Sequence, residues 1–327
     1  MKKIIGFILG TALLLLVFSP TGCASKKKES LRLGLGLYTS AKATSATEDA
    51  NGSGSASVTA AAILLDENNK ITACVLDCAE SRVSYSASGK ALAGEELLTK
   101  REQGDGYGMK AYGGAFREWY EQADAFSALA IGKTLDSLKE LVTEDGKGND
   151  EVIRAGCTIS VSDFVKAIEK AVQNAVPSEA TPTDRLKLGA SSTQTARDAD
   201  GDIKGLNEIE TTFFAATVDG NGKLTAAYTD CVQAEFTFDA NGISQNDGDW
   251  ILSSKRDAGD DYGMKAYGGA AKEWYEQAAA FDHACIGKTA SEISGLVTEN
   301  GKSSAELQSA GCTISVSGFV KAASKIG

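Results

Sequence analysis

Residues 107–126 read YGMKAYGGAFREWYEQADAF, and residues 262–281 read YGMKAYGGAAKEWYEQAAAF. The two stretches are identical at 17 of 20 positions, at an offset of 155 residues. After the glycine pair of the first stretch, apolar residues recur at the spacing of one helix face: Phe116, Trp119, Tyr120, Ala123 and Phe126. We therefore predict that the glycine pair opens an amphipathic helix in each stretch.

A second pair of blocks repeats at the same offset. AGCTISVSDFVKA at 155–167 matches AGCTISVSGFVKA at 310–322 at 12 of 13 positions. Because solenoid repeats are about 20–50 residues long, this period indicates a duplicated domain. We predict two tandem homologous domains, at 31–175 and 186–327, joined by a linker at 176–185 that holds two of the three prolines.

Each copy also carries the pattern of a β-hairpin. Apolar and β-branched runs at 58–65 and 71–77 flank an Asp/Asn-rich turn, and the runs at 212–218 and 224–228 flank an Asp/Gly-rich one. Strands come first in each copy and helices follow. This order predicts an α+β fold, in which each domain is an antiparallel sheet packed with helices.

Further helices are expected in the second half of each copy. One begins after Thr134, and its counterpart begins with a capping box from Thr289 to Glu292. Residues 158–161 read as a short strand, after which Ser162 can cap a last helix. The inner face of that helix is expected to consist of Val165, Ile168 and Val172.

The N-terminus has the pattern of a targeting signal. Residues 1–22 hold two lysines, an apolar run at 4–18 and small residues before Cys23, which resembles the lipobox of bacterial lipoproteins. We expect a signal peptide at 1–22 and a lipid anchor and tether at 23–30, with Cys23 lipidated; a plain secretory signal is the alternative. The predicted location is the extracytoplasmic face of the cell membrane.

Composition excludes several functional classes. The formal net charge of -11 argues against nucleic-acid binding, which needs a basic surface. The single histidine, His283, cannot serve a site that both copies share. There is no P-loop, serine–histidine or metalloprotease motif, so we expect no enzyme and no metal site. Asp198, Asp200 and Asp202 suggest a calcium loop only weakly, since Ile203 replaces the required glycine.

Six cysteines follow Cys23. Cys78 and Cys231 occupy matching positions in the two copies, and so do Cys157 and Cys312. In an exported protein this pattern allows one disulfide per copy, and buried free thiols are an equal alternative.

The arrangement resembles the FMN-binding domain of sodium-pumping quinone reductase and Rnf-type electron-transport subunits. The hairpins, the lipid-anchored tandem and the segments at 155–160 and 310–315 carry the resemblance. These segments are similar to the family's Ser-Gly-Ala-Thr-x-Thr/Ser motif, although Val152 and Leu307 replace its upstream acidic residue. In the family, the motif's threonine can carry FMN through a phosphodiester bond. The resemblance implies FMN sites at Thr158 and Gly156 and at Thr313 and Gly311.

Two further groups are candidates for ligand contacts. A glycine pair with a nearby lysine can hold a phosphate, although such a pair is more often a tight turn. Tyrosines in the same loops can stack on a flavin ring, whereas Trp119 and Tyr120 are expected in the core. The candidates are Lys110, Tyr112, Gly113 and Gly114, with Lys265, Tyr267, Gly268 and Gly269.

The sequence thus favours a membrane-anchored flavin-binding lipoprotein in electron transfer, with membrane redox proteins as partners. Two alternatives stay open: a lipoprotein that binds a small solute, and a surface interaction lipoprotein.

Overall fold

The computed structural model describes residues 31–92, 94, 97–246 and 248–327, so the predicted signal peptide, lipidation site and tether at 1–30 lie outside it. The first unit contains β1 (Arg32–Thr44), β2 (Gly52–Leu65), β3 (Ile71–Tyr85), β4 (Ala91–Leu92), α1 (Lys100–Gln103), the 3-10 helix η1 (Gly104–Tyr107), α2 (Trp119–Ala130), α3 (Leu135–Lys139), α4 (Asp150–Ala155) and α5 (Ser162–Gln173). A short strand, β5 (Val176–Pro177), follows.

The second unit repeats this order with small differences. It contains β6 (Arg185–Arg197), β7 (Gly205–Val218), β8 (Leu224–Phe238), β9 (Gly248–Leu252), α6 (Lys255–Ala258), η2 (Gly259–Tyr262), α7 (Trp274–Cys285), η3 (Glu292–Leu296), α8 (Ala305–Ala310) and α9 (Ser317–Ser324). The predicted α+β class with antiparallel sheets is confirmed.

Two antiparallel sheets form the centre of the molecule. One has the order β4-β3-β2-β1-β5, and the other has the order β6-β7-β8. Strand β9 of the second unit leaves its own sheet and pairs with β1, from Thr39 opposite Leu252 to Ala43 opposite Gly248. The two units are therefore joined by backbone hydrogen bonds.

The inner faces of the sheets share one apolar core. Leu33 and Leu35 of β1 belong to the same buried cluster as Phe213 of β7 and Val232 of β8. Since successive residues of a strand alternate between its two faces, Gly34, which lies between these leucines, is on the outer face. The units are thus packed together, and the predicted linker begins with β5, which pairs with β1.

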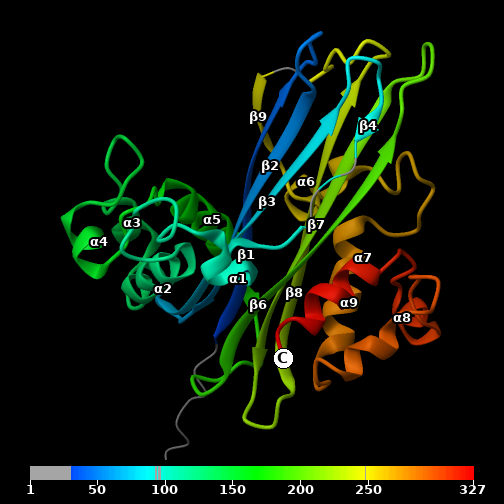
Figure 1. Cartoon of the computed structure of the whole chain (residues 1–327). Helices are drawn as coiled ribbons and strands as arrows, with labels where there is room; N and C mark the ends of the chain where they lie inside the picture. The colour runs from blue at the N-terminus through cyan, green and yellow to red at the C-terminus, as the bar shows by residue number, and fades with distance from the viewer. Residues whose placement is uncertain (1–30, 93, 95–96, 247) are drawn as a thin grey trace, which may run out of the picture.

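Helices cover the outer faces of the two sheets. Figure 1 shows α2 to α5 on one side of the long strands and α7 to α9 on the other. Gly34 and Gly36 of β1 allow α5 to approach closely, since a Cβ at either position would lie 2.0–2.1 Å from a carbonyl oxygen of that helix. Gly189 of β6 faces α9 in the same way. The chain therefore forms four layers, helix, sheet, sheet and helix.

Local predictions agree with the structure to different degrees. Both hairpins are confirmed, and Asp66 and Asp219 hold their turns by accepting amide hydrogens through Oδ1. The segment at 158–161 is not a strand and forms only an isolated bridge through Ser160. The capping box from Thr289 to Glu292 is present, but it opens a 3-10 helix.

The last helix of the first unit also differs slightly from its prediction. Ser162 is the first residue of α5, not its cap, and its hydroxyl contacts Ser160 and Asp163. Val165 and Ile168 are buried as expected, and Val172 is half-buried.

A buried aspartate lies at the same place in each unit. Asp77 Oδ1 accepts the amide hydrogens of Cys78 at 2.7 Å and Arg101 at 3.2 Å, and Asp230 does the same with Cys231 and Arg256. Burial raises the pKa of both carboxyl groups from 3.8 to about 6, against the opposing effect of these hydrogen bonds.

These pKa shifts predict a measurable pH dependence. A folded-state pKa above the unfolded value stabilises the fold at low pH, and this stabilisation is lost as pH rises through the folded pKa. We compare the wild type with an Asp77→Asn, Asp230→Asn variant. Relative to this variant, the wild-type free energy of unfolding should fall by about 3 kcal/mol per carboxyl between about pH 3 and pH 7. Urea unfolding across this range measures the difference, and a difference independent of pH contradicts the prediction.

Candidate functional site

The two repeated sequence blocks meet in space within each unit. The Gln122 side chain of α2 accepts hydrogen bonds through Oε1 from the Thr158 amide at 2.8 Å and from the Thr158 hydroxyl at 3.0 Å. Gln277 of α7 holds Thr313 with the corresponding distances of 2.8 and 3.1 Å. The blocks at 107–126 and 155–167 thus build one continuous surface.

The threonine of each site is exposed beside a basic side chain. Arg117 Nη1 donates to the Ala155 carbonyl oxygen at 3.4 Å, next to Gly156. Gly156 has a φ of 103°, and a Cβ there would lie 2.1 Å from Arg117 Nη1. The glycine therefore permits both the left-handed turn and the close guanidinium.

The second unit repeats this arrangement with lysine in place of arginine. Lys272 Nζ lies 3.4 Å from the carbonyl oxygen of Ala310, and Gly311 has a φ of 94°. Each unit thus has an exposed threonine three residues after a carbonyl group that a basic side chain contacts.

The predicted position of the glycine pairs relative to the helices is wrong. Gly113 and Gly114 lie in a turn, and α2 begins only at Trp119. The loop amides of Met109 and Lys110 donate to the carboxylate of Glu118 at 2.8 and 3.0 Å. These amides therefore already hold an anion, which is part of the protein itself.

The same loop arrangement is found in the second unit. Gly268 and Gly269 again precede the helix, and Glu273 accepts the amides of Met264 and Lys265. Each loop lysine pairs with an acid on the following helix: Lys110 Nζ lies 3.4 Å from Glu121, and Lys265 Nζ lies 3.3 Å from Glu276.

Aromatic side chains of the loops divide between core and surface. Tyr112 and Tyr267 are 92% and 91% exposed, so their rings are accessible to a ligand. Trp119 is buried, as expected for core packing. Phe116 was predicted on the buried helix face but is fully exposed, because it precedes the helix.

The positions where the resembled family has an acid belong to the core here. Val152 and Leu307 are both completely buried, in α4 and α8. A carboxylate at either position would be expensive to bury. The apolar residue is therefore part of this fold's packing.

A cluster around a largely covered lysine in each unit was not predicted. Lys100 Nζ lies 3.4 Å from Glu80 of β3, and Lys255 Nζ lies 3.2 Å from Glu210 of β7. Each lysine also lies over a tyrosine ring and a tryptophan ring. One sequence signal could have identified these lysines: Lys100 and Lys255 are separated by 155 residues, the same offset as the repeated blocks.

The six cysteines that the structure describes are free thiols, which is the second of the two alternatives from the sequence. Cys78, Cys157, Cys231, Cys285 and Cys312 are buried, and Cys74 is half-buried. Burial raises the pKa of the Cys157 thiol to about 11, and those of Cys78, Cys231 and Cys312 also rise. Such thiols are unreactive.

The weak calcium motif has a structural explanation. The carboxylate of Asp198 accepts hydrogen bonds from Lys90 Nζ and the Ala91 amide, both at 2.9 Å. Asp198 thus connects the β6–β7 loop to β4 of the first unit.

Comparison with known protein families, with curated proteins and with solved structures finds no match. No helix in the part of the chain that the structure describes is long and apolar enough to cross a membrane.

Proposed function

We propose that this protein is a non-catalytic flavin carrier that binds one FMN in each unit, at the surfaces around Thr158 and Thr313. The observation that supports this most is the paired geometry of the two threonines. Each threonine is exposed, its hydroxyl is held by a buried glutamine, and a basic side chain contacts the carbonyl oxygen three residues before it. FMN at these sites would supply the electron transfer.

Residues of the two repeated blocks suit the parts of FMN. Arg117 and Lys272 offer positive charge to the phosphate group. Tyr112 and Tyr267 offer exposed rings for stacking on the isoalloxazine. The loop amides do not contribute, because Glu118 and Glu273 occupy them.

The proposal includes the location of the protein. A lipid anchor at Cys23 would hold the two units at the extracytoplasmic face of the cell membrane, within reach of membrane redox proteins. The basic residues that follow Cys23, Lys26 to Lys28, would lie against anionic headgroups.

The visible spectrum of the purified chain tests flavin binding. We expect oxidised-flavin absorption in the wild-type protein or after addition of FMN. In bound protein each threonine hydroxyl would turn from its glutamine to donate a charge-assisted hydrogen bond to the phosphate. Flavin binding should therefore fall at least about tenfold in the Thr158→Ala, Thr313→Ala variant, which lacks both hydroxyls. Flavin that stays with the denatured polypeptide would be covalently attached.

A matched control separates the hydroxyl from the surrounding turn. The Thr158→Ser, Thr313→Ser variant keeps both hydroxyls and should retain flavin. A colourless wild-type protein that takes up no added FMN overturns the proposal, and so does full flavin retention by the double alanine variant.

A further inference from the structure

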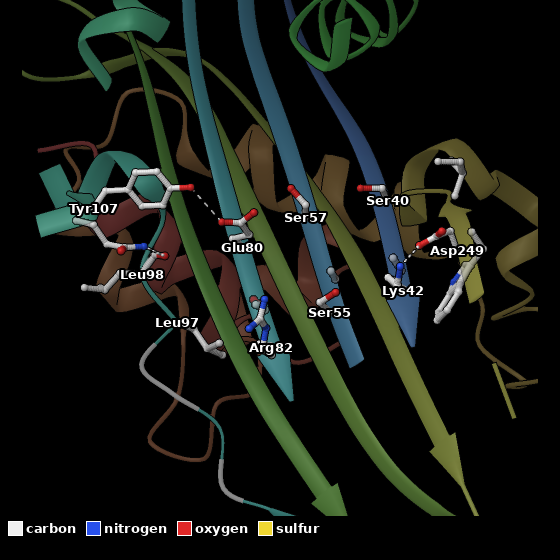
Figure 2. Close-up of a pocket in the computed structure, with 16 residues that line it drawn as sticks. Ser40, Lys42, Ser55, Ser57, Glu80, Arg82, Leu97, Leu98, Tyr107 and Asp249 are labelled. Carbon is white, nitrogen blue, oxygen red and sulfur yellow. Dashed lines mark hydrogen bonds and ion pairs between the residues drawn. The ribbon is translucent and has the colours of Figure 1, made fainter. Parts of the chain in front are cut away.

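A polar hollow of about 960 Å³ lies on the outer face of the first sheet, further along the strands than the contact with α5 (Figure 2). Its floor consists of two rows that cross β1, β2 and β3 in register. One row is Ser40, Ser57 and Glu80, and the other is Lys42, Ser55 and Arg82. The middle strand, β2, contributes only a serine to each row. The longer side chains of Lys42 on β1 and of Glu80 and Arg82 on β3 therefore form the walls of a trough.

Both units contribute to this hollow. Asp249, Trp250 and Ile251 of β9 line one side, and Leu98 and Tyr107 line the other. The exchange of β9 onto β1 therefore completes a cavity that the first unit alone would leave open. A volume of this size is in the range of about 300–1,000 Å³ that is usual for small-molecule sites.

The charges in the hollow leave one cation available. Glu80 is already paired with Lys100 and accepts a hydrogen bond from the Tyr107 hydroxyl at 3.3 Å. Lys42 Nζ lies 3.6 Å from Asp249. Arg82 has no ion-pair or hydrogen-bond partner among the residues that the structure describes.

The second unit does not have such a trough. Its matching rows are Thr193, Glu210 and Gln233, and Thr195, Glu208 and Glu235. The carboxylates of Glu208 and Glu235 thus replace Ser55 and Arg82. The second unit keeps the lysine cluster, in which Lys255 pairs with Glu210. The two units share a framework, but only the first offers a cationic, hydroxyl-lined floor.

We propose that this hollow binds a small carboxylated sugar. Arg82 would bind the carboxylate, since a guanidinium matches its two oxygens. The hydroxyls of Ser40, Ser55 and Ser57 would exchange hydrogen bonds with sugar hydroxyls. Tyr107 provides a ring against which the apolar face of a sugar packs.

Calorimetric titration of the purified chain with digalacturonate, and with neutral cellobiose as the comparison, tests this site. We expect digalacturonate to bind and cellobiose to bind at least about tenfold more weakly, because it lacks the charge-assisted hydrogen bonds. Arg82→Gln should weaken digalacturonate binding about tenfold or more. The matched control Glu235→Gln, at the same position of the second unit, should leave it unchanged.

A second variant should have the opposite effect. Asp249→Asn removes the carboxylate that competes for Lys42 and should tighten digalacturonate binding by about threefold, as expected for an exposed ion pair. The Thr158→Ala, Thr313→Ala variant should bind the sugar as the wild type does, which separates this site from the flavin sites. No binding of digalacturonate, equal binding of cellobiose, or no effect of Arg82→Gln overturns the proposal.

Discussion

Replacing Gly34 or Gly189 with alanine is expected to lower the free energy of unfolding by about 3 kcal/mol, because sheet and helix backbones touch there. A Cβ on Gly34 would lie 2.0 Å from the carbonyl oxygen of Ala171 in α5. On Gly189 it would lie 2.2 Å from the carbonyl oxygen of Ala322 in α9. Backbone atoms cannot rotate away, so the helix itself has to shift.

The control for this prediction is Gly295→Ala in η3, where a Cβ would meet nothing within 4 Å. That change should be neutral or slightly stabilising, since alanine reduces the entropy of the unfolded chain. Urea unfolding monitored by tryptophan fluorescence compares the three variants. Wild-type stability in both Gly34→Ala and Gly189→Ala would show that the helices are not held against the strands at these points.

The hairpins could be predicted from the sequence because their signals are local. Asp66 and Asp219 are within a few residues of every amide that they bind, and the runs beside them alternate or are apolar. The exchange of β9 onto β1 could not be predicted in this way. It joins residues about two hundred positions apart, and no local pattern specifies which edge a short strand will choose.

The candidate site shows the same division. Thr158 and Thr313 were identified through a motif, but Gln122 was missed because it lies in the other repeated block and is not among the apolar residues that mark the helix face. In the structure Gln122 is only 1% exposed and connects the two repeated blocks. Periodicity also misplaced Phe116, since it extended the helix beyond its start at Trp119.

The change of Glu118 to alanine is expected to destabilise the first unit by about 2–4 kcal/mol. The carboxylate is 1% exposed and is the acceptor for the Met109 and Lys110 amides. Loss of both acceptor oxygens leaves two amides unpaired, each at a cost of about 1–3 kcal/mol. Glu118→Gln keeps one acceptor oxygen and should lie between the wild type and the alanine variant.

Hydrogen exchange of individual amides tests this prediction with a control inside the same chain. In Glu118→Ala, the Met109 and Lys110 amides should lose their protection. Those of Met264 and Lys265 should keep it, because Glu273 still accepts them at 2.9 and 3.0 Å. Equal protection in both loops would mean that the carboxylate does not order the loop. Loss in both would mean that the units open together through the core that their sheets share.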